Sequence, residues 1–206
     1  VVKILMQNAA KLSLDLNTKD HYGRSAFLLA CFNGHNHVVK IFMENATTFD
    51  IDIHSKDTRG STGFHLACQS GVTDVVKIFM QNAAKLNFDL NMKNSVSWTA
   101  FHLACVNGHT DVVKIFMENA STFGIDIKTK DWNGSTGFKL ACKEGLTDMV
   151  KMFMQNATQL SFDLNMKDDV NWTAFHWACL KGHTDVVKIF MKNALTLGIN
   201  LNTESD

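Results

Sequence analysis

Residues 94–130 read NSVSWTAFHLACVNGHTDVVKIFMENASTFGIDIKTK, and variants of this stretch recur along the 206-residue chain every 37 positions. Five cysteines and five glycines mark the period: Cys31, Cys68, Cys105, Cys142 and Cys179, and Gly34, Gly71, Gly108, Gly145 and Gly182. A fixed period in the range of about 20–50 residues predicts stacked supersecondary units. Because such arrays mostly bind other molecules and rarely catalyse reactions, the period limits the function as well as the fold.

The same stretch predicts two helices separated by a glycine. Thr99 is a good N-cap for a first helix of about ten residues that ends at Gly108. Thr110 can cap a second helix, and Asp111 then lies in its first turn, where the helix dipole favours a negative charge. Residues 125–127 alternate apolar and polar side chains, which favours a short extended arm before the next turn.

The sequence of this unit resembles that of the ankyrin-repeat family, and the resemblance covers essentially the whole chain. The family's TPLHxA motif corresponds to TGFHLA at 62–67, TAFHLA at 99–104, TGFKLA at 136–141 and TAFHWA at 173–178. Its Gly-His followed by VVKLLL corresponds to GHTDVVKIFM at 108–117 and 182–191. The resemblance implies an all-α fold, an ankyrin-repeat solenoid of stacked helix-turn-helix units with short β-turn or hairpin arms. It also implies that His65, His102 and His176 brace turns through hydrogen bonds.

We expect a single ankyrin-repeat domain over residues 1–206. It comprises a half repeat at 1–19 and full repeats at 20–56, 57–93, 94–130, 131–167 and 168–204. Because the chain begins inside a second-helix motif, we expect it to be a piece of a longer array. Repeat 57–93 resembles repeat 131–167 more closely than it resembles its neighbour 94–130, so the duplicating unit was a pair of repeats.

Three departures from the family pattern carry structural expectations. The chain contains no proline, and Gly63 and Gly137 replace the helix-initiating proline in two repeats, where they should be weaker helix starts. The repeat has 37 residues where the family usually has 33, and the surplus predicts about one extra turn on the second helix. Ser97 and Asn171 replace a turn glycine, and asparagine tolerates a positive φ better than serine does.

Composition argues against several classes of partner. The 20 basic and 20 acidic residues cancel, whereas a nucleic-acid groove or an anionic membrane surface calls for a basic excess. No apolar run approaches the roughly 20 residues that span a bilayer, and the first residues carry no signal-peptide pattern. The cysteines share one register, so neighbouring thiols lie too far apart for a disulfide, and we expect all five to be buried and inert. These features predict a cytoplasmic, intracellular protein with reduced thiols.

The sequence favours neither catalysis nor a cofactor. Cys105 and His109 have a spacing that could hold zinc on a helix, but Gly108 interrupts that helix, and the histidine is replaced in alternate repeats. No Ser-His-Asp order, phosphate-cradling glycine loop or isolated carboxylate pair departs from the repeat frame. We therefore predict no enzyme activity, no catalytic residue, no metal, no cofactor and no small-molecule substrate.

The family resemblance implies that the turn tips and the exposed side of each first helix line a concave face that binds targets. The matching positions here are Tyr22, Arg24, Arg59, Gln69, Val96, Trp98, Val106, Trp132, Asn133, Lys143, Val170, Trp172 and Leu180. The repeats also differ most at these positions, which fits either a diverged binding surface or neutral drift. Exposed tryptophans supply much of the binding energy at interfaces, and Trp132 is the better candidate. Trp98 and Trp172 could instead pack over the adjacent turn, and we expect Trp177, which replaces a leucine, to lie in the core.

Together these features predict a protein–protein interaction module that binds a partner protein through its concave face, as an adaptor or scaffold. The first alternative is a structural spacer or spring array in a larger protein. The second is the targeting part of a multidomain enzyme or toxin. The sequence does not identify the partner.

Overall fold

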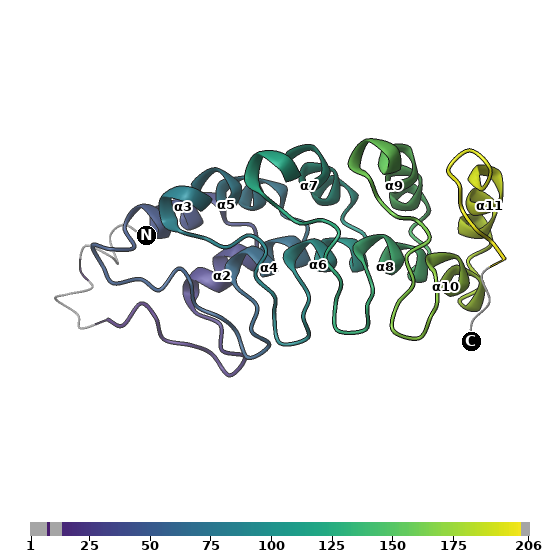
Figure 1. The fold of residues 1–206 in the computed structure, drawn as a ribbon. Helices are drawn as coiled ribbons and strands as arrows, with labels where there is room; N and C mark the ends of the chain where they lie inside the picture. Colours follow the sequence, from purple (N-terminus) through teal and green to yellow (C-terminus); the bar gives the residue numbers. More distant parts are fainter. Residues whose placement is uncertain (1–7, 9–13, 203–206) are drawn as a thin grey trace. The chain divides into compact units, whose positions relative to one another are not determined.

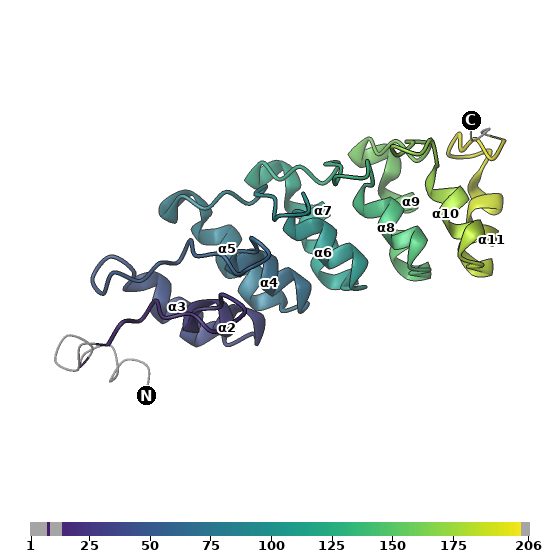
Figure 2. The same cartoon turned by 90° about the horizontal axis from the view of Figure 1, so that it is seen from below.

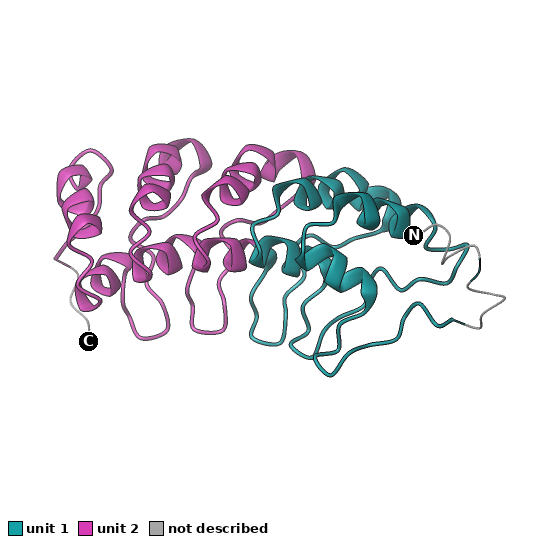
Figure 3. Cartoon of the chain, turned by 180° about the vertical axis from the view of Figure 1, so that it is seen from behind, with its two compact units in different colours: residues 1–100 teal, residues 101–206 magenta. Residues whose placement is uncertain are grey.

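The computed structural model describes residue 8 and residues 14–202, and it divides the chain into unit 1, residues 1–100, and unit 2, residues 101–206 (Figure 3). In the described part we find ten helices and no strand, which confirms the all-α prediction. Unit 1 contains α2 (Ala26–Phe32), α3 (Asn36–Glu44), α4 (Gly63–Gln69) and α5 (Thr73–Leu86). The helix α6 (Ala100–Val106) begins at the boundary, and unit 2 continues with α7 (Thr110–Phe123), α8 (Gly137–Lys143), α9 (Thr147–Leu160), α10 (Ala174–Leu180) and α11 (Thr184–Asn193).

Each repeat contributes a first helix of seven residues and a longer second helix. Within each unit the first helices lie side by side in one layer and the second helices form another (Figures 1 and 2). In unit 1, α2 packs on α4 and α3 packs on α5. In unit 2, α8 packs on α10, and α9 contacts α7 and α11. A seven-residue helix is too short to be stable alone, so the packing between repeats must stabilise the first layer.

Side-chain caps start the first helices as predicted. Ser25, Thr62 and Thr136 each precede a first helix, and their hydroxyl oxygens accept a backbone N–H from the helix's first turn. The helix α6 likewise begins at the residue after Thr99. These helices are shorter than the predicted ten or so residues: each has seven, and a turn separates the helix from the glycine. The glycine takes the left-handed conformation, with φ of 76° at Gly108.

The second helices begin one residue earlier than predicted. The N-cap of α7 is His109, which makes no capping bond through its side chain, and Thr110 is the first helical residue. The Thr110 hydroxyl contacts the Gly108 carbonyl oxygen at 3.5 Å instead of capping an N–H. Asp111 lies in the first turn, as the sequence predicts.

The extra helical turn forms in three repeats only. The helices α5, α7 and α9 have 14 residues each and end at a left-handed residue, Asn87, Gly124 or Ser161. The helices α3 and α11 have nine and ten residues, so the prediction is wrong for them, and turns replace the last helical turn. Residues 125–127 form an irregular segment and the start of a turn, where the sequence predicted an extended arm.

Phenylalanine rings connect successive repeats in the core of each unit. In unit 1 the ring of Phe79 lies 5.5 Å from that of Phe64 in its own repeat and 6.2 Å from that of Phe27 in the preceding repeat. In unit 2 Phe153 repeats this arrangement, 5.4 Å from Phe138 and 6.1 Å from Phe101. Aromatic pairs at such distances each contribute about 0.5–1.5 kcal/mol beyond their buried area. Phe79 and Phe153 thus join repeats 57–93 and 131–167 to the repeat before each of them.

The glycines at the starts of α4 and α8 have a packing role that the sequence did not indicate. A Cβ built on Gly63 would lie 2.8 Å from the Sγ of Cys31 and 2.9 Å from the ring of Phe79. A Cβ on Gly137 would lie 2.7 Å from both the Sγ of Cys105 and the ring of Phe101. Side chains do not approach that closely, so glycine lets these helices start against the thiol of the preceding repeat.

The cysteines are all free, and four of the five are buried as predicted. Burial raises the pKa of the Cys31, Cys105 and Cys142 thiols well above the ordinary value. Cys179 departs from the prediction because it is exposed. The first helix of the next repeat packs against the Sγ of Cys31 and of Cys105, and no later repeat in this sequence covers α10.

Candidate functional site

Each repeat carries a closed turn, which we call a tip: residues 20–24, 57–61, 94–98, 131–135 and 168–172. In every tip the side-chain Oδ1 of the first residue accepts the backbone N–H groups of the third and fifth residues, at distances of 2.7–3.2 Å. These first residues are Asp20, Asp57, Asn94, Asp131 and Asp168. The fourth residue is left-handed, including Ser97 (φ 58°) and Asn171 (φ 60°), where the family has glycine. The register of Asp and Asn every 37 residues is the signal that sequence reasoning missed.

Backbone hydrogen bonds also join neighbouring tips. The N–H of Thr58 donates to the Tyr22 carbonyl (2.9 Å) and that of Ser95 donates to the Arg59 carbonyl (3.0 Å). In unit 2 the N–H of Asp169 donates to the Asn133 carbonyl (3.2 Å). The second, third and fifth tip residues therefore project from a closed and cross-linked backbone.

The first tip presents a cation and an aromatic ring together. The Arg24 guanidinium lies 4.5 Å from the centroid of the exposed Tyr22 ring and pairs with Asp20 at 2.8 Å. The hydrogen bonds from the Arg24 backbone and guanidinium hold the pKa of the Asp20 carboxyl below its ordinary value. The ring of His21 contacts that of Tyr22, with centroids 3.8 Å apart and the planes tilted by 45°.

The other predicted binding residues of unit 1 differ in accessibility. Arg59 and Val96 are exposed at the second and third tips. Gln69, at the end of α4, and Trp98, at the end of the third tip, are half-buried. Tyr22, Arg59 and Val96 are thus the accessible members of this set.

Unit 2 places most of its predicted residues at the surface. Trp132 is 68% exposed, and Val170 and Leu180 are each 59% exposed. Asn133 is exposed beside Trp132, at the same tip. The remaining members, Val106, Lys143 and Trp172, are half-buried.

Trp177 is not the core residue that the sequence predicted. It is half-buried, whereas Leu66, Leu103 and Leu140 in the same register are buried. Its ring lies 5.0 Å from that of Trp172, and the Lys143 ammonium lies 4.4 Å from its centroid. Phe175 and His176 of the same helix are half-buried as well, and no later repeat in this sequence covers α10, while the contact with Trp172 joins Trp177 to the surface set.

The histidines of the repeat motif brace turns, as the resemblance implied. Nδ1 of His65 accepts the Thr62 backbone N–H (3.3 Å), so Nε2 carries the ring proton and donates it to the Trp98 carbonyl at 3.2 Å. Desolvation of the buried ring lowers the pKa of His65 to about 4, although the bond to the Trp98 carbonyl opposes the shift. In unit 2, Nε2 of His102 lies 3.3 Å from the Ser135 carbonyl oxygen, and Nδ1 of His176 lies 2.8 Å from the Thr173 hydroxyl.

Lys139 takes the place of this histidine in α8, and its environment is unusual. Its Nζ donates to the Trp172 carbonyl at 2.7 Å and lies 3.3 Å from Oδ2 of Asp168. The two charged side chains are each only 2% exposed. Desolvation lowers the pKa of the Lys139 ammonium, while the Asp168 carboxylate opposes that shift. The pKa of the Asp168 carboxyl stays below its ordinary value, because hydrogen bonds from Trp177 and Trp172 and the Lys139 charge outweigh desolvation.

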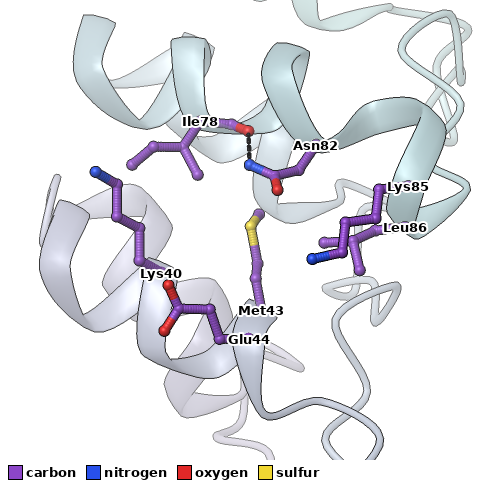
Figure 4. A pocket seen from close by; sticks show the side chains of 7 residues that line it. All are labelled: Lys40, Met43, Glu44, Ile78, Asn82, Lys85 and Leu86. Carbon is purple, nitrogen blue, oxygen red and sulfur yellow. Dashed lines mark hydrogen bonds between the residues drawn. The ribbon is translucent and has the colours of Figure 1, made fainter.

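The hollows between second helices carry no comparable chemistry. One of about 220 Å³ lies between α3 and α5, and Figure 4 shows Met43 between Lys40 and Lys85 along it. The Asn82 amide there donates to the Ile78 carbonyl within its own helix at 2.8 Å. A hollow of about 450 Å³ between α9 and α11 has equivalent lining, including Met154. These hollows therefore recur with the repeat.

The described residues contain no group of three or more His, Cys, Asp or Glu side chains placed to hold a metal ion. In the described ranges, no helix combines the length and apolar character needed to cross a bilayer.

Comparison with known proteins agrees with this geometry. A family model of three consecutive ankyrin repeats matches residues 1–88, 47–131 and 122–205. No curated protein sequence matches the chain. The matches to the family model, the paired helices and the closed tips concur, and the chain belongs to the ankyrin-repeat family.

Proposed function

We propose that this chain is an adaptor or scaffold module that binds a partner protein through its tips and the adjacent ends of its first helices, the concave face of the family resemblance. Ankyrin repeats generally mediate protein–protein interactions. The observation that carries the proposal is the set of large apolar side chains exposed on closed tips, Tyr22, Val96, Trp132 and Val170. Exposed aromatic side chains on a rigid backbone lose little conformational entropy on binding, so they make effective contacts.

The proposed module works by binding alone, without a cofactor, metal or catalytic step. Ankyrin-repeat proteins are typically interaction modules and not enzymes. An intracellular, cytoplasmic location is part of the proposal, and the free cysteines support it because disulfides are rare in reducing compartments.

Affinity capture with two matched variants tests this function. The tip variant changes Tyr22, Val96, Trp132 and Val170 to alanine, and the control variant changes Met191 and Leu195, which are exposed away from the tips. Circular dichroism first establishes that both variants fold. We expect the original chain and the control to retain the same partner from lysate and the tip variant to lose it. Specific capture by none of the proteins would favour the spacer array, and equal capture by all three would contradict binding through the tips.

A further inference from the structure

A pair of tryptophans distinguishes repeat 168–204 from the other repeats. The rings of Trp172 and Trp177 lie 5.0 Å apart at an interplanar angle of 60°, and the other four repeats have leucine at the position of Trp177. The Lys143 ammonium rests 4.4 Å from the centroid of the Trp177 ring. The exposed side chains of Val170 and Leu180 belong to the same tip and the same helix as the two tryptophans. A cation, two aromatic rings and two aliphatic side chains therefore share one surface.

The buried ion pair of Lys139 and Asp168 holds both tryptophans in place through hydrogen bonds. Oδ2 of Asp168 accepts the Trp177 indole N–H at 2.6 Å, and Oδ1 accepts the Trp172 backbone N–H at 2.9 Å. Lys139 donates to the Trp172 carbonyl at 2.7 Å and neutralises Asp168. A binding surface held by such bonds is preorganised, which lowers the entropic cost of forming a complex.

The Lys143 ammonium is the charged group of this surface that remains available to a ligand. Asp168 is neutralised by Lys139, and the Trp177 indole N–H is already engaged. Among the described residues no carboxylate lies within ion-pairing distance of the Lys143 ammonium. Glu144, Asp169 and Lys181 are exposed nearby in the chain and sum to a single negative charge. The ammonium on the aromatic ring is thus the charge in direct contact with the apolar surface.

We propose that this surface, Lys143, Val170, Trp172, Trp177 and Leu180, binds a peptide segment in which an aspartate or glutamate adjoins aromatic or large aliphatic side chains. The carboxylate pairs with the Lys143 ammonium, and the apolar side chains pack on the two indoles and the flanking aliphatic groups. This inference rests on the proposed function and names the partner's chemistry. Stacked bases with phosphates are the less favoured ligand, because the single Lys143 ammonium can pair with one carboxylate but cannot neutralise a run of phosphates.

Titration of three peptides into the ¹⁵N-labelled chain tests the inference. The probes are acetyl-Phe-Glu-Leu-amide and its versions with Gln or Lys in the middle, and a dT12 oligonucleotide serves as a fourth ligand. The readout is the indole N–H cross-peaks of Trp172 and Trp177. We expect the Glu peptide to shift both peaks with a Kd about two- to fivefold lower than that of the Gln peptide, the range for an exposed ion pair. The Lys peptide should bind most weakly.

Two variants control for the residues involved. Lys143→Met keeps the aliphatic stem and removes the charge, so it should abolish the preference for Glu over Gln while leaving the Trp177 peak in place. Trp177→Leu restores the residue of the other repeats, so it should fold and should lose binding of all three peptides.

Several outcomes would overturn the inference: a Lys peptide that binds as tightly as the Glu peptide, a Glu preference that survives in Lys143→Met, the absence of any indole shift, or a stronger response to dT12. If the peptides fail while Trp172→Ala and Trp177→Leu leave partner capture intact, the partner binds elsewhere on the tips. In that case the inference fails and the proposed function stands.

Discussion

The substitution Asp168→Asn isolates the energetic role of the buried ion pair. Asparagine preserves the tip-closing oxygen, because Oδ1 of Asn94 accepts the same two N–H groups at the equivalent position (3.1 and 2.9 Å). It removes the negative charge that lies 3.3 Å from Lys139 Nζ. Taking away one partner of a buried pair costs about 3–5 kcal/mol, because the other charge remains desolvated.

The proton equilibrium of Lys139 limits that cost. A stranded lysine can lose its proton, and at pH 7 this costs about 5 kcal/mol for an amine of ordinary pKa, at about 1.4 kcal/mol per pH unit. The loss of the Trp177 hydrogen bond adds about 1 kcal/mol. We therefore expect Asp168→Asn to lower the free energy of unfolding by about 4–6 kcal/mol, measured by urea denaturation at pH 7 with far-UV circular dichroism.

A double variant and a matched control make this reasoning refutable. Lys139→His combined with Asp168→Asn recreates the combination of residues found at His65 and Asn94, so it should recover all but about 1.5 kcal/mol of the original stability. Asp57→Asn, at the same tip position, has no buried cation beneath it because Leu28 holds the equivalent site, and it should cost less than about 1 kcal/mol. Equal losses for Asp168→Asn and Asp57→Asn would refute the ion-pair account, as would a double variant no more stable than Asp168→Asn alone.

Three further predictions concern the repeat frame. Gly137→Ala should lower the free energy of unfolding by about 0.5–2 kcal/mol, because overpacking against Cys105 exceeds the gain of up to about 1 kcal/mol in helix propensity, and a raised Tm would contradict this. The free energy of unfolding should fall by at most about 3 kcal/mol between pH 6.5 and pH 4 because of His65. The pKa of this imidazole is about 4 in the folded protein, so the unfolded chain binds the proton first as the pH falls. His65→Gln should flatten the measured pH dependence of stability. A thiol reagent should modify Cys179 rapidly and the four buried cysteines only on unfolding; a second fast thiol in Cys179→Ser would contradict the burial.

The period of the sequence predicted the elements that every repeat must share. Apolar spacing, the hydroxyl caps and the glycine after the first helix recur in register, so one reading of residues 94–130 applies to all copies. Features that depend on a single copy were predicted less well. The helices α3 and α11 stop short of the extra turn although their sequences resemble those of the longer helices. The exposure of Cys179 depends on whether another repeat covers it, which its register cannot indicate.

The surface set was predicted from register, and its chemistry was not. Lys139 replaces the family histidine at a single position. Its role could be predicted only by knowing that its ammonium contacts the tip 33 residues later in the chain. The hydrogen bond from His65 to the Trp98 carbonyl spans the same 33 residues, so a single repeat pair with known geometry would have revealed it. Long-range pairings of this kind follow from the fold and become readable in the sequence only after the fold is known.

Drift and selection can be weighed separately at the two kinds of tryptophan. The tip-closing bonds use the first residue and the backbone, so Trp132 can change with little effect on the fold, and drift at an exposed position accounts for it as well as binding does. Trp177 is different, because a specific acceptor within the protein holds its indole N–H. Asp168 supplies that acceptor, and Lys139, absent from the other repeats, neutralises its charge. Trp177 and Lys139 both depart from the repeat pattern, and both belong to one hydrogen-bonded network. Independent drift produces two such matched changes less readily than a single change, which favours selection for the aromatic surface of unit 2.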